Sequence, residues 1–210
     1  MKIGLSLIKY PIAAAALTGL VMTTTPAHSA TLERTPVTDV YETNSVPPKG
    51  TDAPAILANA PSADVTVKGE HKKATIVVDL TKNILYKYDK DGNAQKAYLI
   101  CSGKKSSPTD PGLRVVSHVE VSPFKAAPKT TKRSRNPAPY GKRAIILNIL
   151  DPVTGEQFQT GKFIHGNNAP ASLGFYESLG CMRMDNDAVI ELSQMVKRGD
   201  IVNILPNKNL

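Results

Sequence analysis

The chain has 210 residues, a length that favours one ordinary domain with shorter segments attached to it. Its formal net charge is +8, from 26 Lys and Arg residues against 18 Asp and Glu residues. A basic balance of this size is compatible with an anionic polymer or surface as partner. The sequence has no helix-turn-helix, zinc-finger spacing or aromatic-basic RNA signature, so nucleic acid is not an expected partner.

Residues 1–29 have the layout of a secretory signal peptide. Lys2 and Lys9 form a positive segment before an apolar run over residues 10–22, and Ala27 and Ser29 are the small residues that a signal peptidase requires. The apolar run is short for a membrane span. We therefore expect export across the inner membrane to the periplasm or cell wall, with no integral membrane segment after cleavage.

The region that follows divides into a linker and a domain. Residues 30–70 are predicted to form an extended, unpacked linker, because five prolines interrupt a polar stretch with little periodicity. A folded domain is expected over residues 71–207.

Short β-branched and apolar runs separated by turn residues predict that this domain is mainly β. The Asp91-Gly92 pair is typical of a hairpin turn between two of these runs. Strands are predicted over residues 74–80, 84–88, 97–101, 113–121, 144–149, 162–164 and 200–205. One helix is predicted over residues 186–197, with Asp185 as its N-cap.

A basic stretch over residues 125–143 contains seven Lys and Arg residues, several prolines and no acidic residue. Two interpretations stay open at this point. The stretch is either a solvated loop or a basic flap beside a groove for an anionic polymer.

The residues that suggest chemistry are His165, at a predicted strand end, and Cys181, in a turn that contains Gly180. A thiol becomes an effective nucleophile as the thiolate, and a nearby imidazole accepts its proton and later returns one to the leaving amine. A glycine-containing turn can also aim backbone N–H groups at a developing oxyanion. The only other cysteine is Cys101, and in an exported protein a Cys101–Cys181 disulfide is the alternative interpretation.

The segment Phe163-Ile164-His165-Gly166, followed by Ser178-Leu179-Gly180-Cys181-Met182-Arg183, resembles the catalytic signature of the L,D-transpeptidases (YkuD-like domains). The resemblance covers about residues 72–206. Its further blocks are Ile76 to Tyr88, Leu99 to Gly103, Pro108 to Gly112 and Gly199 to Val202. Two positions depart from the family's pattern: Leu179, where the family usually has a histidine, and Cys101, where it usually has a small polar or apolar residue.

The resemblance implies a β-sandwich with one helix packed near the cysteine turn. It implies Cys181 as the nucleophile and His165 as the base, with the Gly166 carbonyl orienting the imidazole. It also implies that backbone N–H groups around Gly180 and Cys181 form the oxyanion site. For Ser178 and Arg183 it implies bracing of the turn or a contact to a substrate carboxylate. No cofactor and no metal are expected, because the four histidines have no Cys or carboxylate at ligand spacing.

The implied reaction is acyl transfer between peptidoglycan stem peptides through a thioester on Cys181. The acceptor is either the amine of another stem, which gives a 3–3 cross-link, or a lysine of a lipoprotein. With water as acceptor the same site is an L,D-carboxypeptidase or a hydrolase of existing links. A non-catalytic wall-binding module is the remaining alternative. The resemblance also implies that a carbapenem acylates Cys181.

Overall fold

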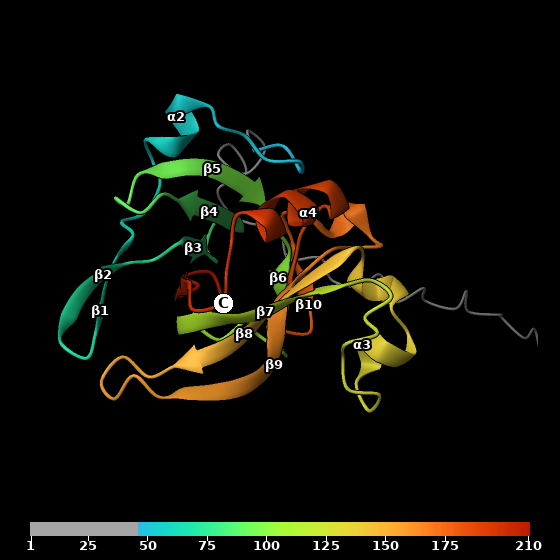
Figure 1. Cartoon of the computed structure of the whole chain (residues 1–210). Coiled ribbons are helices and arrows are strands. Elements are labelled where there is room, and N and C mark those ends of the chain that lie inside the picture. Colours follow the sequence, from blue (N-terminus) through green and yellow to red (C-terminus); the bar gives the residue numbers. More distant parts are fainter. Residues whose placement is uncertain (1–45) are drawn as a thin grey trace, which may run out of the picture. The chain divides into compact units, whose positions relative to one another are not determined.

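The computed structural model describes residues 46–210 (Figure 1). The expected signal peptide and residues 30–45 of the expected linker lie outside the described residues. The strands are β1 (Asp64–Val67), β2 (Glu70–Lys73), β3 (Ile76–Asp79), β4 (Ile84–Tyr88), β5 (Ala94–Leu99), β6 (Ser102–Gly103), β7 (Gly112–Val121), β8 (Arg143–Leu150), β9 (Gln157–His165), β10 (Tyr176–Ser178), β11 (Met182–Arg183) and β12 (Ile201–Leu205). The helices are α2 (Pro54–Leu57), α3 (Lys132–Arg135) and α4 (Asn186–Gln194), with short 3-10 turns η1 (Ala138–Tyr140) and η2 (Pro170–Ser172).

Eight strands form one sheet in the order β11-β9-β8-β7-β12-β3-β4-β5. Most neighbours are antiparallel, while β12 runs parallel to β3 and β11 runs parallel to β9. The last strand, β12, lies between β7 and β3, so the C-terminal segment joins the two halves of the sheet. Each of the seven strands predicted from the sequence corresponds to a strand of this sheet, although β9 begins five residues earlier than expected.

The main core lies inside the curl of this sheet. Its buried side chains come from strands at both ends of the strand order, for example Leu85 of β4 and Ile164 of β9, and from Val189 and Leu192 of helix α4. Strands from opposite ends share one core because the twisted sheet folds back on itself, as a sandwich requires. The expected mainly β fold, with one substantial helix beside it, is confirmed.

Helix α4 begins where the sequence predicts. The Asp185 carboxylate accepts hydrogen bonds from the N–H groups of Asp187 (2.8 Å) and Ala188 (3.3 Å), as an N-cap does. The helix ends at Gln194, three residues before the predicted end. The cause is Asp200, whose carboxylate accepts the backbone N–H of Lys197 at 2.9 Å and so favours a turn over another helical bond.

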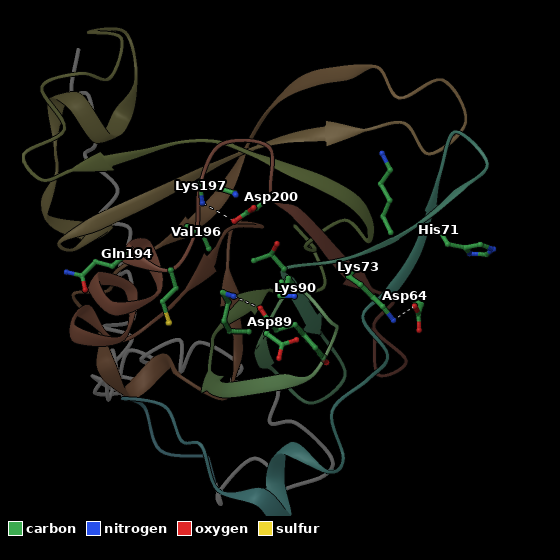
Figure 2. Close-up of a pocket in the computed structure, with 14 residues that line it drawn as sticks. Asp64, His71, Lys73, Asp89, Lys90, Gln194, Val196, Lys197 and Asp200 are labelled. Atoms are coloured by element: carbon green, nitrogen blue, oxygen red, sulfur yellow. Dashed lines mark hydrogen bonds and ion pairs between the residues drawn. The ribbon is translucent and has the colours of Figure 1, made fainter.

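The prediction of an unpacked linker is wrong for residues 46–70. Helix α2 and the β1–β2 hairpin lie in this segment, and Val46, Ala63 and Val65 are buried. They cover the second face of the sheet, where Ile84, Tyr86 and Tyr88 would otherwise expose large apolar surfaces to water. The hairpin also borders a cavity of about 780 Å³ (Figure 2).

Candidate active site

The pairing of β9 with β11 brings the two predicted catalytic residues to one face of the sheet. In this parallel pair Met182 lies opposite Ile164 and Arg183 opposite His165. Both Met182 and Ile164 point into the main core. Because side chains alternate along a strand, His165 and Arg183 point to the other face, and Cys181, one residue before β11, points there too.

His165 closes β9 and is only 4% exposed. Its Nδ1 lies 2.6 Å from the Gly166 carbonyl oxygen. A carbonyl only accepts hydrogen bonds, so this partner assigns the proton to Nδ1 and leaves Nε2 as the basic nitrogen. The pKa of His165 is lowered to about 4, chiefly by burial. The bond to the Gly166 carbonyl and a backbone contact with Tyr140 oppose the change, and the Arg183 charge adds to it. The imidazole is therefore a neutral base at neutral pH.

An aromatic wall surrounds the imidazole. The Tyr140 ring, from η1, lies 5.1 Å from the His165 ring, and the Phe163 ring lies 5.4 Å from it. Tyr140 and Phe163 also stack on each other at 5.8 Å. These contacts exclude water from one side of His165 and explain its burial.

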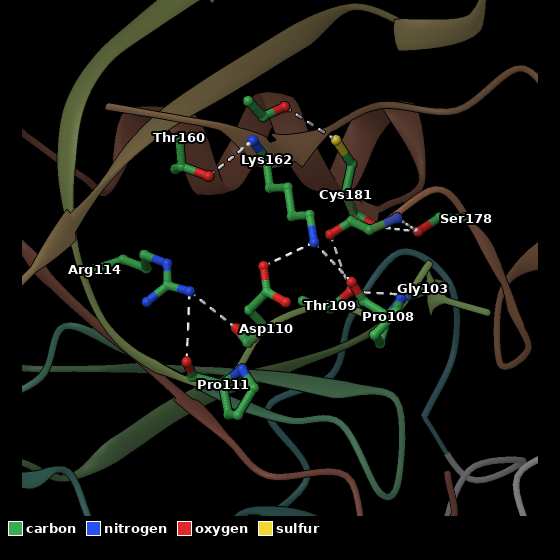
Figure 3. Close-up of polar contacts among 12 residues, drawn as sticks. Gly103, Pro108, Thr109, Asp110, Pro111, Arg114, Thr160, Lys162, Ser178 and Cys181 are labelled. Carbon is green, nitrogen blue, oxygen red and sulfur yellow. Dashed lines mark hydrogen bonds and ion pairs between the residues drawn. The ribbon is translucent and has the colours of Figure 1, made fainter. Parts of the chain in front are cut away.

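The Cys181 thiol is half-buried, and its Sγ donates to the Gly161 carbonyl at 3.9 Å (Figure 3). Burial raises the pKa of Cys181, although the Phe163 N–H and the charges of Arg183 and Lys162 act in the opposite direction. Within residues 46–210 no hydrogen bond joins this thiol to His165. The resting site thus holds a protonated thiol and a neutral imidazole on the same face, a looser arrangement than a substrate complex needs.

The turn that carries Cys181 is braced from both sides. The Ser178 hydroxyl donates to the Cys181 carbonyl at 2.5 Å and accepts the Gly180 N–H at 3.0 Å. The Thr109 hydroxyl donates to the Gly180 carbonyl at 3.0 Å and accepts the Gly103 N–H at 2.9 Å. Ser178 therefore serves the turn itself rather than an open contact surface.

These bonds correct one half of the predicted oxyanion site, the N–H of Gly180, and leave the other half, the N–H of Cys181. The Gly180 N–H is already committed to Ser178 and is not free to meet an oxyanion. In the described part of the chain the N–H of Cys181 has no partner, which makes it the donor that remains available.

Glycine is nonetheless required at position 180 for steric reasons. Its φ is +103°, and an added Cβ would lie 2.7 Å from Lys162 Cε. Lys162 cannot easily withdraw, because its ammonium binds the Asp110 carboxylate at 2.7 Å and the Pro108 carbonyl at 2.9 Å (Figure 3).

Arg183 combines a fixed backbone with an available charge. Its N–H and C=O both pair with the backbone of Cys101, at 2.8 and 2.9 Å. Its half-buried guanidinium has no carboxylate partner among residues 46–210, yet it lies close enough to lower the pKa values of His165 and Cys181. An unpaired guanidinium at this position suits recognition of a substrate carboxylate.

The two cysteines are free thiols, so the alternative Cys101–Cys181 disulfide is not formed. Cys101 is fully buried, and burial raises the pKa of its thiol. Of the two, only Cys181 is accessible to a reactant.

Asn186 is a site residue that sequence reasoning missed. Its Oδ1 accepts the N–H groups of Lys142 (3.0 Å) and Asn167 (3.3 Å), and its Nδ2 donates to the Asn167 carbonyl (2.8 Å). An added Cβ on Gly166 would lie 2.3 Å from this Oδ1. Asn186 thereby fixes the segment whose Gly166 carbonyl orients His165. Its partners are 19 and 44 residues away in the sequence, so no local sequence pattern indicates this role.

The basic stretch over residues 125–143 is partly a structural element. Arg133 binds the buried Glu120 carboxylate through Nε (2.5 Å) and a terminal nitrogen (2.8 Å), and its guanidinium lies 5.3 Å from the Phe163 ring centre. Lys132 and Arg135 border a second cavity, of about 290 Å³, together with Tyr140 of the aromatic wall. Residues 46–210 contain no group of three His, Cys, Asp or Glu side chains arranged for a metal ion.

Comparison with known proteins agrees with the predicted resemblance. The sequence profile of the L,D-transpeptidase catalytic domain (YkuD) matches residues 73–204. The YkuD L,D-transpeptidase of Bacillus licheniformis is 33% identical over 132 residues, which cover 62% of this chain and 65% of that protein. Its Bacillus subtilis namesake is 54% identical over 73 residues, which cover 34% of this chain and 38% of that protein. The chain thus spans less than two thirds of both relatives.

Among solved structures, a mutant of the Enterococcus faecium L,D-transpeptidase superposes with a TM-score of 0.45 and 24% identity. The superposition covers 63% of this chain and 49% of that chain.

Proposed function

The chain belongs to the L,D-transpeptidase catalytic-domain family, and from that premise we propose that it is a cysteine acyltransferase acting on peptidoglycan stem peptides. The observation that carries the proposal is the β9–β11 pairing, which sets Cys181 and His165 on one face of the sheet. The Gly166 carbonyl holds the proton of His165 on Nδ1, so Nε2 can accept the thiol proton.

The first half-reaction forms a thioester. His165 Nε2 accepts the proton of the Cys181 thiol as Sγ attacks the carbonyl carbon of the third, diaminopimelate-type residue of a stem, whose amide bond leads to D-alanine. The Cys181 N–H donates to the developing oxyanion. The C–N bond then breaks, and the protonated His165 returns its proton to the departing amine, so that D-alanine leaves.

The second half-reaction restores the thiol. An acceptor amine attacks the thioester carbonyl while His165 Nε2 takes the amine's proton. The C–S bond breaks, the proton passes to the Cys181 sulfur, and a new amide remains. A stem-peptide amine gives a 3–3 cross-link, a lipoprotein lysine gives protein anchoring, and water gives hydrolysis.

Substrate recognition in this proposal uses the charges around the site. The unpaired Arg183 guanidinium meets a stem-peptide carboxylate, and Lys132 and Arg135 attract the acidic polymer near the aromatic wall. Export to the periplasm or cell wall, proposed from residues 1–29, would place the enzyme beside this substrate. Within residues 46–210 no helix is sufficiently long and apolar to span a membrane.

The test is product analysis by mass spectrometry after incubation of the purified chain with disaccharide-tetrapeptides. We expect release of D-alanine and formation of cross-linked or hydrolysed product. Cys181→Ala should abolish both, whereas Cys101→Ala, the matched control, should retain most activity. His165→Gln should lower turnover by roughly 10²–10⁴-fold. Equal activity of the two cysteine variants would refute the proposal, and absence of any product from the unmodified chain would favour a binding module.

A further inference from the structure

The cavity of about 780 Å³ lies outside the candidate active site. Its walls are the β1–β2 hairpin, the end of β4 with the following turn, and the segment after helix α4 (Figure 2). None of Cys181, His165 and Arg183 borders it. Part of the hairpin precedes the residues 73–204 that the family profile matches, so the cavity is not a feature of the matched domain alone. Its volume is typical of a site for a small molecule or a polymer segment.

The carboxylates that border the cavity are engaged by the protein itself. Asp64 pairs with Lys73 at 2.6 Å. Asp89 accepts two backbone N–H groups of its own turn, each at 2.9 Å, and Asp200 accepts the backbone N–H of Lys197 at 2.9 Å. Figure 2 shows the Asp64 and Asp200 bonds at two sides of the cavity.

Five lysines line the same cavity. Three of them have a carboxylate partner, namely Lys72, Lys73 and Lys90. The other two, Lys87 and Lys197, have no carboxylate within ion-pair distance in the described part of the chain. Asp89 and Asp200 lie close enough to act on the Lys87 charge, but neither forms an ion pair with it.

Lys87 is the more informative of the two because it is only 7% exposed. Its ammonium donates one hydrogen bond, to the Tyr88 carbonyl, and retains two further donors. Burial lowers the pKa of Lys87, although the Asp200 and Asp89 charges oppose the change. A buried ammonium without an ion pair is unfavourable, and an anion bound in the cavity would remove that cost.

We propose that this cavity is a binding site for an organic anion with carboxylate or phosphate groups, held by Lys87 and Lys197. The ligand would bind whether or not Cys181 is present, so the site is independent of the proposed acyl transfer. Cell-wall polymers supply both kinds of anion: peptidoglycan carries carboxylates, and glycerol phosphate polymers carry phosphates.

The test is an NMR titration of the purified chain with three probes: a soluble muropeptide, a glycerol phosphate oligomer and neutral chitotetraose. We expect saturable shifts of backbone amides around the cavity with one or both anions and none with chitotetraose. Lys87→Met and Lys197→Gln should each weaken binding about tenfold, since each removes a charged hydrogen-bond donor. The tighter anion identifies the source of the ligand.

Lys105→Gln is the matched control, because it removes the same charge from an exposed position outside the cavity. It should leave the Kd unchanged, and Cys181→Ala should do so too. If Lys87→Met fails to fold, the exposed Lys197 still tests the site. Absence of saturable shifts, or equal weakening by Lys197→Gln and Lys105→Gln, would overturn the proposal.

Discussion

The buried base His165 should make the stability of the protein depend on pH in a way that one substitution removes. Its pKa falls from 6.5 to about 4 on folding, chiefly because the side chain is buried. The folded chain thus binds fewer protons than the unfolded chain between these values. The contribution of this pKa difference to the free energy of unfolding is therefore fully present above pH 6.5 and is lost as the pH falls towards 4.

The size of this effect follows from the two pKa values. A difference of one unit corresponds to about 1.4 kcal/mol. Lowering the pH from 7.5 to 4 should therefore cost the wild-type chain about 3 kcal/mol of unfolding free energy through His165 alone. His165→Gln carries an uncharged side chain and lacks this contribution.

Urea unfolding of both proteins at pH 7.5, 5.5 and 4.0 measures the difference directly. All other titrating groups are shared, so they largely cancel when the two curves are subtracted. We expect the variant to be less stable at pH 7.5 and the gap to close by about 3 kcal/mol at pH 4.0. Parallel curves for the two proteins would refute the assignment of His165 as a buried neutral base.

Substitutions at Asn186, at Gly180 and in the basic stretch test the surroundings of the site. Asn186→Ala should lower turnover about tenfold or more, because it releases the segment that orients His165, and Asn186→Asp should cause a smaller loss. Steady-state kinetics measures both, and unchanged turnover in Asn186→Ala would contradict the role. Gly180→Ala should destabilise the chain by about 1–3 kcal/mol in urea unfolding, because φ is positive and the Cβ position is occupied, and a neutral effect would contradict the geometry. Replacing Lys132 and Arg135 with Ser should weaken binding to sacculi at low salt and leave thermal stability nearly unchanged. Arg133→Ser should instead lower stability, because it breaks the buried ion pair with Glu120. Equal melting temperatures for the two variants would refute this distinction.

Local signals predicted most elements of the domain. The β-branched and apolar runs predicted seven of the eight strands of the main sheet, all except β11, and Asp185 marked the start of α4. The packed segment over residues 46–70 was missed because its composition is polar and rich in proline. The signal that could have found it is β4, where all five residues from Ile84 to Tyr88 are buried, so that both faces of the strand need a cover.

The candidate site shows a similar division. The resemblance singled out Cys181 and His165, but their common face depends on the β9–β11 register, which no local pattern encodes. The charge run over residues 125–143 gave no sign that Arg133 is committed to Glu120, since a buried partner is visible only in the fold. Likewise, the sequence gives no indication that the Gly180 N–H donates to the Ser178 hydroxyl and is therefore not available to an oxyanion.

The most direct test of the acyl transfer mechanism is to trap the acyl-enzyme with a β-lactam. A carbapenem has a strained amide that a thiol beside a base and an N–H donor should open. Intact-protein mass spectrometry of the reduced, folded chain, followed by peptide mapping, should show one adduct on Cys181 that is absent from Cys181→Ala and greatly slowed in His165→Gln. An adduct on Cys101, or no mass increase at all, would contradict the assignment of Cys181 as the nucleophile.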